Sequence, residues 1–263
     1  MTKDLRAALY VIPDGFRVRL KGDIMGKITL CEDRLIFERR DELTVIEPYG
    51  PDCLRVRSTR NNKILDEDWT LLPQKDGAEC VITGDEKEAV IKNGMMSARI
   101  EAGFPWYGGI ISYYLKDKMI LHTKFEGDYT GRNVHTEGDH YQVKMIFDAN
   151  KGEHIYGLGQ EQEDQFDRKG STVNLQHYNT KSAVPVIYSS LGYGFFWNNP
   201  APGRCETTNN HTMWVADSAY QADFLVYAGE TPADVMKIYC DLTGYAPKFP
   251  EWAAGFWQSK LRY

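Results

Sequence analysis

Short stretches with alternating apolar and polar residues recur along most of this chain, from about Phe16 to Tyr227. The clearest are FRVRL, GKITL, RLIFERR, CLRVRST, EAVIKNG, GIISYYL, YQVKMIF, PVIYSS, YGFFWNN and DFLVYAG. A period of two places successive side chains on opposite faces of a strand, and Gly, Asn or Asp interrupts the pattern roughly every 8 to 15 positions, as turns require. We therefore expect antiparallel sheets with one buried and one solvated face, assembled as a β-sandwich.

One helix is predicted near the C-terminus, in TPADVMKIYCDLTG. Thr231 is a suitable N-cap, Pro232 suits the first helical position, and Gly244 can adopt the left-handed conformation that ends a helix. The apolar residues that share one helical face are Val235, Ile238, Tyr239 and Leu242. We expect this face to pack against a sheet.

Charge and hydropathy exclude several classes of partner. The net charge of −6, from 31 basic and 37 acidic residues, provides no basic face that would neutralise a phosphate backbone, so we expect no nucleic-acid partner. No apolar stretch approaches the roughly 20 residues that cross a bilayer, so we expect no membrane partner. The opening MTKDLRAALYVIPDG lacks the features of a signal peptide, which predicts a cytoplasmic protein.

The cysteines and histidines give no metal-binding or disulfide pattern. Five cysteines are widely spaced with no CxxC pair, which argues against a disulfide framework and against a zinc site. His135 and His140 lie closest together, but their spacing fits neither one helical face nor alternate strand positions. We therefore expect no metal site.

Two glycines and an acidic cluster stand out in HIYGLGQEQEDQFDRKG, residues 154–170. Gly157 and Gly159 lack the third glycine and the helix of a nucleotide-binding fingerprint, so we expect a tight turn or the close approach of another backbone. The acidic residues are Glu161, Glu163, Asp164 and Asp167. Carboxylates adjacent in one loop seldom face each other across a substrate, and we interpret the cluster as a solvated loop.

A polar segment from Gln176 to Lys181 joins two of the predicted strands. Loops carried on a rigid sandwich commonly hold binding residues. The same segment could be an ordinary hairpin connection in which Asn179 and Thr180 hydrogen-bond their own backbone. The residues alone leave both interpretations open.

Five blocks of the sequence, in this order, resemble glycoside hydrolase family 31, which contains the α-glucosidases and α-xylosidases. The blocks are HIYGLGQ, the segment from DRKG to NLQHYNT, PVIYSSLGYGFFWNN, TPADVMKIYCDLTG and PKFPEWAAGFWQSKLRY. In that family an N-terminal β-sandwich related to galactose mutarotase packs against a (β/α)₈ barrel that carries the chemistry. The resemblance implies an all-β fold: an antiparallel β-sandwich of the galactose mutarotase-like supersandwich type, one C-terminal helix, and the first strand of a missing barrel. It divides the chain into a sandwich over residues 1–246 and a linker with the first strand of a truncated barrel over residues 247–263.

The function implied by this resemblance is that of the N-terminal portion of a retaining α-glycosidase, either an α-glucosidase or an α-xylosidase. This portion would support the barrel and lend one loop to the substrate site. The two catalytic aspartates of the family lie on later barrel strands, so we assign no catalytic residue and expect the fragment alone to be inactive. The implied partners are an α-linked oligosaccharide or glycoside and the missing barrel, with no cofactor.

The resemblance also implies candidate substrate-binding residues. In the family a sandwich loop reaches the barrel mouth, and the segment from Gln176 to Lys181 occupies the matching place. The candidates are His177, Tyr178, Asn179, Thr180 and Tyr263. Amide and hydroxyl groups would bind sugar hydroxyls and rings would stack on the sugar. Tyr263 ends the implied barrel strand, at the face where active sites of such barrels lie.

The closing stretch GFWQSKLRY reads as a barrel strand without its neighbours. We expect it to be disordered, docked on the sandwich, or buried against another chain, because its aromatic residues would lack the barrel. An alternative function is a free-standing carbohydrate-binding β-sandwich module without hydrolytic activity. A mutarotase-like epimerase would need a catalytic His and Glu facing each other, and the sequence shows no such pair.

Overall fold

A computed structural model describes residues 10–11, 17–18, 26–39, 42–61, 63–66, 68, 70–74, 80–103, 109–124 and 134–258. Almost all regular structure in this part of the chain is antiparallel β-sheet. In chain order the elements are β1 (Tyr10–Val11), β2 (Arg17–Val18), β3 (Lys27–Leu30), β4 (Leu35–Arg39), β5 (Glu42–Pro48), β6 (Cys53–Thr59), β7 (Val81–Gly84), β8 (Glu88–Asn93), β9 (Met96–Glu101), β10 (Ile110–Leu115), β11 (Lys118–His122), β12 (Val134–Glu137), β13 (His140–Asp148), β14 (Ile155–Gln160), β15 (Thr172–Leu175), β16 (Ser182–Ser189), β17 (Tyr193–Trp197), β18 (Gly203–Thr207), β19 (His211–Ala219), β20 (Ala222–Ala228), α1 (Pro232–Thr243) and the 3₁₀ helix η1 (Glu251–Ala254).

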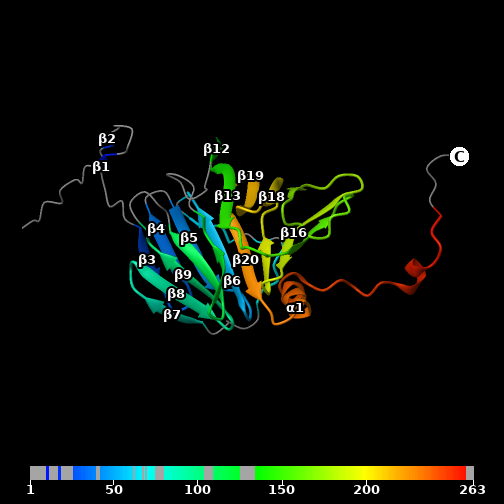
Figure 1. Ribbon diagram of the computed structural model, residues 1–263, viewed down its shortest axis with the longest axis horizontal. Helices are drawn as coiled ribbons and strands as arrows, with labels where there is room; N and C mark the ends of the chain where they lie inside the picture. Colours follow the sequence, from blue (N-terminus) through cyan, green and yellow to red (C-terminus); the bar gives the residue numbers. More distant parts are fainter. Residues whose placement is uncertain are drawn as a thin grey trace, which may run out of the picture.

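Three large sheets form the sandwich (Figure 1). One has eight strands in the order β14-β16-β17-β20-β6-β5-β4-β3. The others have five strands each, in the orders β11-β10-β9-β8-β7 and β12-β13-β19-β18-β15. The expected all-β sandwich is therefore confirmed, and most of the alternating stretches in the sequence are strands.

The main core lies between these sheets and is rich in aromatic rings. Phe195 stacks between Trp214 and Phe224, with ring centroids 4.9 and 5.0 Å away, and the edge of Phe147 packs against Phe195 at 5.6 Å. All four rings are fully buried. Buried aromatic rings contribute large apolar areas and favour offset or edge-to-face contacts, so many of the aromatic residues stabilise the core.

One part of the sequence prediction is wrong: the outer face of the central strands is not solvated. Every residue of β6, β17 and β20 is buried. α1 and Leu71, from the segment after β6, lie on the outer face of the eight-stranded sheet, and they form a second core cluster there with residues that include Val186, Phe196 and Leu225. The alternating pattern correctly predicts strands, but it does not show that a second layer covers them.

The helix has the predicted boundaries. Thr231 and Asp234 form a capping box: the Thr231 hydroxyl accepts the Asp234 N–H at 3.2 Å, and the Asp234 carboxylate accepts the Thr231 N–H at 2.9 Å. Gly244 follows the helix with φ of +100°. Val235 and Leu242 are buried against the sheet, so the predicted packing face is confirmed.

Gly157 and Gly159 allow the close backbone approach that the sequence predicts. A Cβ atom at Gly157 would lie 2.4 Å from the Val186 carbonyl oxygen, and one at Gly159 would lie 2.0 Å from the Ser182 carbonyl oxygen. The register between β14 and β16 shifts between these two glycines. The pair therefore forms a bulge that only glycine accommodates.

The residues after α1 extend away from the sheets as an arm (Figure 1). Trp252, Phe256 and Trp257 are 74%, 92% and 65% exposed. Trp257 packs within the arm against Trp252, with ring centroids 5.7 Å apart, and donates a hydrogen bond to the Ala253 carbonyl. Gly255–Gln258 lie outside any strand, and the remaining residues of the implied barrel strand lie outside the described residues.

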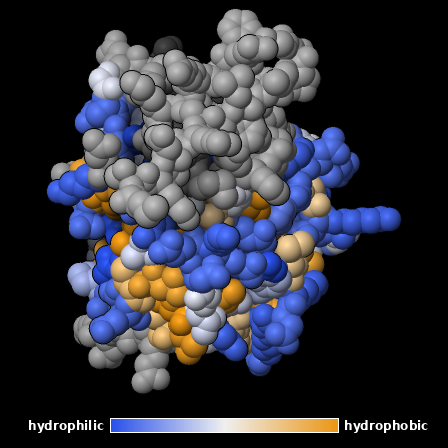
Figure 2. Space-filling model, turned by 90° about the vertical axis from the view of Figure 1, so that its left-hand side faces the viewer, coloured by the Kyte–Doolittle hydropathy of each residue, from blue (hydrophilic) through white to orange (hydrophobic). Residues whose placement is uncertain are grey.

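Another apolar patch is exposed at the edge of the sandwich that carries β3 and β7. Figure 2 shows apolar side chains on this face, bordered by hydrophilic ones. Leu30 of β3 and Val81 of β7 are among the exposed large apolar residues. Both strands are the last members of their sheets, so the patch lies at two sheet edges.

Candidate functional site

The segment predicted to bind substrate forms a tight turn between β15 and β16. Tyr178 and Lys181 pair across it, and each backbone N–H donates to the other's carbonyl at 3.2 Å. The Tyr178 hydroxyl donates to the side-chain oxygen of Gln176 at 2.8 Å. His177, Tyr178, Asn179 and Thr180 are all exposed, so the structure brings these four candidates together on one solvent-facing turn.

Thr180 has an unusual backbone conformation in this turn. Its φ is +76°, in the left-handed region that β-branched residues rarely adopt. Its hydroxyl donates to the carbonyl of Asn179. The hydroxyl bond is a local side-chain to backbone contact of the kind expected for an ordinary hairpin connection. The uncommon backbone conformation favours the other interpretation, because residues in such conformations cluster at binding sites.

A nearly buried ion pair that the sequence does not reveal holds the base of this turn. Lys181 Nζ lies 2.7 Å from Glu161 Oε2, and the two side chains are only 18% and 9% exposed. The same ammonium group lies 5.9 Å from the centre of the Tyr178 ring. Lys181 therefore connects the candidate turn to the end of β14 and contacts one of the candidate rings.

The loop after β14 is fixed at its other end by Asp167. One carboxylate oxygen accepts the backbone N–H groups of Ile155 and Lys169, each at 3.0 Å, and the other lies 2.6 Å from His154 Nδ1. Burial acts to raise the pKa of Asp167, but the bonds from His154 and from these N–H groups outweigh it and lower the pKa. Between these ends Glu163 and Asp164 are exposed, as expected for a solvated loop.

The buried carboxylate of Glu153, just before β14, connects the end of this loop to the eight-stranded sheet. Glu153 Oε1 accepts the hydroxyls of Ser189 and Tyr193 at 2.6 and 2.7 Å, and Oε2 lies 3.2 Å from Lys169 Nζ. Burial raises the pKa of Tyr193 well above its ordinary value, so its hydroxyl remains a donor to Glu153. This network fixes the end of the loop to the sheet, and it leaves neither oxygen of Glu153 available to a substrate.

An aromatic stack adjoins the loop. Tyr156 and Tyr188 are opposite each other on β14 and β16 with ring centroids 6.2 Å apart, and Phe166 from the loop packs on Tyr156 at 4.9 Å. Phe166 is 84% exposed. The sequence interpretation missed this stack, because the two tyrosines are 32 positions apart and only the β14–β16 register brings them together.

The site therefore consists of one exposed polar turn and one exposed ring on an anchored loop. Amide, hydroxyl and imidazole groups of the turn can exchange hydrogen bonds with the hydroxyls of a sugar, and Tyr178 offers a ring face. Tyr263, the fifth candidate, lies outside the described residues. Whether these residues bind a sugar stays a prediction.

Among the described residues, no group of three or more His, Cys, Asp or Glu side chains is arranged to hold a metal ion. Helices that are long and apolar enough to cross a membrane are also absent from the described ranges.

Comparisons with a family model, with known sequences and with solved structures all point to the same protein family. A family model described as the glycosyl hydrolase 31 N-terminal galactose mutarotase-like domain matches residues 43–206. The uncharacterized family 31 glucosidase ORF2 of Pseudescherichia vulneris is 32% identical over 86% of this chain, and α-xylosidase A of Aspergillus niger is 36% identical over 84%. The crystal structure of a family 31 α-xylosidase from a soil metagenome, complexed with xylose, matches 90% of the chain with a TM-score of 0.81 and 34% identity.

The chain is shorter than each of these relatives. It spans 46% of the glucosidase, 33% of the fungal xylosidase and 37% of the metagenomic enzyme. The similarity therefore concerns less than half of each protein.

Proposed function

Because this chain belongs to glycoside hydrolase family 31 and corresponds to its N-terminal mutarotase-like domain, we propose that it serves a retaining α-glycosidase by supporting the catalytic barrel and lending the β15–β16 turn to the substrate site. The observation that carries this proposal is the 34% identity, over 90% of the chain, to an α-xylosidase complexed with xylose. Residues 1–246 would form the sandwich, and residues 247–263 the linker and first barrel strand. The exposed aromatic arm supports this division, because Trp252, Phe256 and Trp257 are mostly exposed to solvent.

The substrate would be an α-linked xyloside or glucoside. Two of the three relatives above are named α-xylosidases and one is named a glucosidase, so α-xylosides are the first substrates to test. His177, Tyr178, Asn179 and Thr180 would contact the sugar from the sandwich side, and Tyr263 would do so from the barrel side.

The hydrolytic carboxylates would come from the barrel. Glu153 and Asp223 are the fully buried carboxylates among the described residues, and both are engaged by Lys, Arg, Tyr, Ser or Asn side chains. A retaining glycosidase needs one free carboxylate as nucleophile and a second as general acid, facing each other across the bond. We therefore propose that the sandwich alone does not hydrolyse glycosides.

All five cysteines are free thiols in the structure. Free thiols are usual in reducing compartments, which supports a cytoplasmic location for the enzyme.

The direct test is hydrolysis of aryl α-xylosides and aryl α-glucosides by the full-length protein. We expect hydrolysis of at least one of them with retention at the anomeric carbon, measured by NMR of the first product. Calorimetric binding of oligosaccharides by a protein with no hydrolytic activity would instead favour the carbohydrate-binding module.

The role of the turn is tested by Tyr178→Ala. We expect kcat/KM to fall about tenfold, because one ring contact of roughly 1 kcal/mol or slightly more is lost. Met119→Ala is a control of similar exposure on β11. Equal kcat/KM for Tyr178→Ala and Met119→Ala would remove the turn from the substrate site while leaving the family assignment intact.

A further inference from the structure

The β15–β16 turn connects strands that belong to two different sheets. β15 is the last strand of a five-stranded sheet and pairs with β18, whereas β16 lies in the eight-stranded sheet between β14 and β17. The two strands that flank the turn therefore do not pair with each other in a ladder, as the strands of a regular hairpin do. The position of the turn depends on the contacts at its own base.

The ladder that leads to this base from β14 and β16 is short. Its register shifts at the bulge between Gly157 and Gly159. Beyond the shift only two pairs of the ladder remain before the turn, Gly159 with Ala183 and Gln160 with Ser182. A bulge bends its strand and disrupts the ladder locally, so two backbone pairs alone hold the turn weakly in one direction. A further contact between the two strands is needed to fix it.

Glu161 and Lys181 provide that contact. Because Gln160 pairs with Ser182 in antiparallel strands, Glu161 and Lys181 are opposite each other at the next position toward the turn. Their ion pair, at 2.7 Å, is mostly buried, with side chains 9% and 18% exposed. A buried ion pair adds little net stability over apolar side chains, and its best-attested use is to fix one register. We interpret this pair as the contact that fixes the base of the turn.

Both ring candidates of the turn are held by residues at this base. The backbone of Lys181 exchanges two hydrogen bonds with the backbone of Tyr178, and its ammonium group lies 5.9 Å from the centre of the Tyr178 ring. Two positions further along the chain, the Ala183 N–H donates to His177 Nδ1 at 3.3 Å. A shift of residues 181–183 would therefore move both rings together.

We propose that Lys181, held by Glu161, is a positioning residue of the substrate site, which fixes Tyr178 and His177 in the geometry that meets the sugar. The inference rests on the proposed function, because it takes the β15–β16 turn as part of that site. Lys181 acts through the two rings and not on the reacting bond. Loss of the ion pair should therefore weaken the substrate and the transition state equally, which raises KM and leaves kcat unchanged.

The test is the hydrolysis kinetics of the full-length protein carrying Glu161→Gln, Lys181→Met or both, on the aryl α-glycoside that the parent protein hydrolyses. We expect each single variant to raise KM about fivefold and to keep kcat within about twofold of the parent value. Both substitutions remove the same contact, so the double variant should also raise KM about fivefold and not the roughly 25-fold of independent effects. Lys237→Met, which breaks an exposed ion pair with Asp241 on α1, is the matched control and should leave KM unchanged.

Hydrogen exchange of the same proteins, read by mass spectrometry in peptides that cover the turn, measures the positioning without any activity. We expect faster exchange in Glu161→Gln and Lys181→Met than in the parent protein and Lys237→Met, because the backbone hydrogen bonds of the turn open more often. If the parent protein hydrolyses no α-glycoside, the proposed function fails and this measurement decides the positioning role alone. Faster exchange would then support that role, and unchanged exchange would overturn it.

In an active parent protein, three kinetic results would overturn the proposal. They are an unchanged KM in either single variant, a fall in kcat at unchanged KM, and a multiplied effect in the double variant. Lys181→Met leaves the Glu161 carboxylate buried without its cation, which is strongly destabilising. If that variant fails to fold, the double variant, which removes both charges, decides the question, and a KM equal to that of the parent protein overturns the proposal.

Discussion

Arg55 and Arg57 occupy the polar positions of the alternating pattern in β6, which predicts that they face solvent, yet both are buried. Both side chains project from β6 on the outer face of the eight-stranded sheet and are only 6% and 7% exposed. Their charges are met by acids on other elements: Asp223 on β20 for Arg55, and Glu47 on β5 for Arg57. Buried charges are tolerated only when paired and hydrogen-bonded, so these pairs permit the second layer to cover the sheet.

The buried pair gives a prediction for stability. Asp223→Ala should lower the free energy of unfolding by about 3–5 kcal/mol, because Arg55 would remain buried with only Asp68 as a carboxylate partner. Burial raises the pKa of Asp223, and the hydrogen bonds and positive charge of Arg55 oppose that rise. The Asp223 carboxylate is therefore stabilised in its charged form by Arg55. Denaturant titration of both proteins measures the difference.

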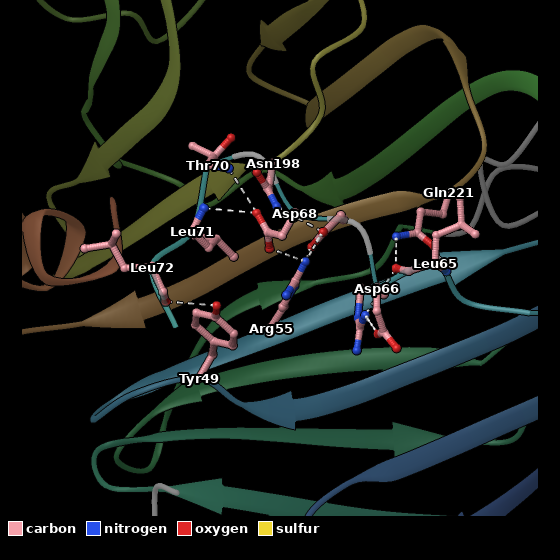
Figure 3. Close-up of polar contacts among 12 residues, drawn as sticks. Tyr49, Arg55, Leu65, Asp66, Asp68, Thr70, Leu71, Leu72, Asn198 and Gln221 are labelled. Atoms are coloured by element: carbon pink, nitrogen blue, oxygen red, sulfur yellow. Dashed lines mark hydrogen bonds and ion pairs between the residues drawn. The ribbon is translucent and has the colours of Figure 1, made fainter. Parts of the chain in front are cut away.

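Two further variants test whether the loss of stability in Asp223→Ala comes from the unpaired buried charge. Replacing both partners, Arg55→Met with Asp223→Leu, should destabilise less than Asp223→Ala alone, because the buried Arg55 charge is removed together with its Asp223 partner and only Asp68, which still accepts two backbone N–H groups, stays charged (Figure 3). Asp241→Ala breaks an exposed pair with Lys237 on α1 and should have a much smaller effect. A double variant that is less stable than Asp223→Ala would contradict this explanation.

At the scale of elements, the loop between β14 and β15 is a short solvated segment with both ends fixed. The ion pair of Glu161 with Lys181 fixes one end, and the contacts of Asp167 fix the other. Phe166 stays exposed between them and packs on Tyr156. The loop and the β15–β16 turn share the Glu161–Lys181 pair, so we expect their positions to be coupled.

The Asp167 anchor predicts a pH dependence. Its pKa in the folded protein lies below the ordinary value of 3.8, so its contribution to stability is present above about pH 4 and is lost as the pH falls through the lower folded pKa. Asp167→Asn should therefore lower Tm by a few degrees at neutral pH, and the difference from the parent protein should shrink in acid. Asp164→Asn, in the exposed part of the loop, is the control and should match the parent at every pH. A difference that grows in acid would contradict the assigned sign.

The sequence predicts those structural features that neighbouring residues determine, and it does not predict those that depend on residues far apart in the chain. The strands β6, β17 and β20 and the cap at Thr231 are set by neighbouring residues, and the patterns predict them. The burial of β6 is not predictable in this way, because Arg55 pairs with Asp223, and the two residues are 168 positions apart in the sequence. The candidate turn is found where the sequence places it, but its anchor at Glu161 depends on the β14–β16 register, which no local pattern encodes.

At the scale of the whole molecule, the apolar residues divide into a packed sandwich and an exposed arm. The rings of Phe195, Phe224 and Trp214 interlock between the sheets, whereas Trp252 and Trp257 contact each other outside the sandwich. Rings in solvent contribute little to the stability of the sandwich, and exposed apolar surface of this kind marks a site of contact with another domain or chain. The proposed barrel is the partner that would cover the arm.

This division predicts that the arm can be changed without loss of the fold. Phe256→Ala combined with Trp257→Ala should alter the free energy of unfolding by no more than about 0.5 kcal/mol, because both side chains are mostly exposed. Phe224→Ala removes a fully buried ring and should cost about 3–5 kcal/mol in the same denaturant titration. A loss above about 1 kcal/mol in the arm variant would show that these rings pack on the sandwich in solution, because exposed side chains seldom contribute that much. The arm would then be part of the sandwich, and the proposed division at residue 246 would be wrong.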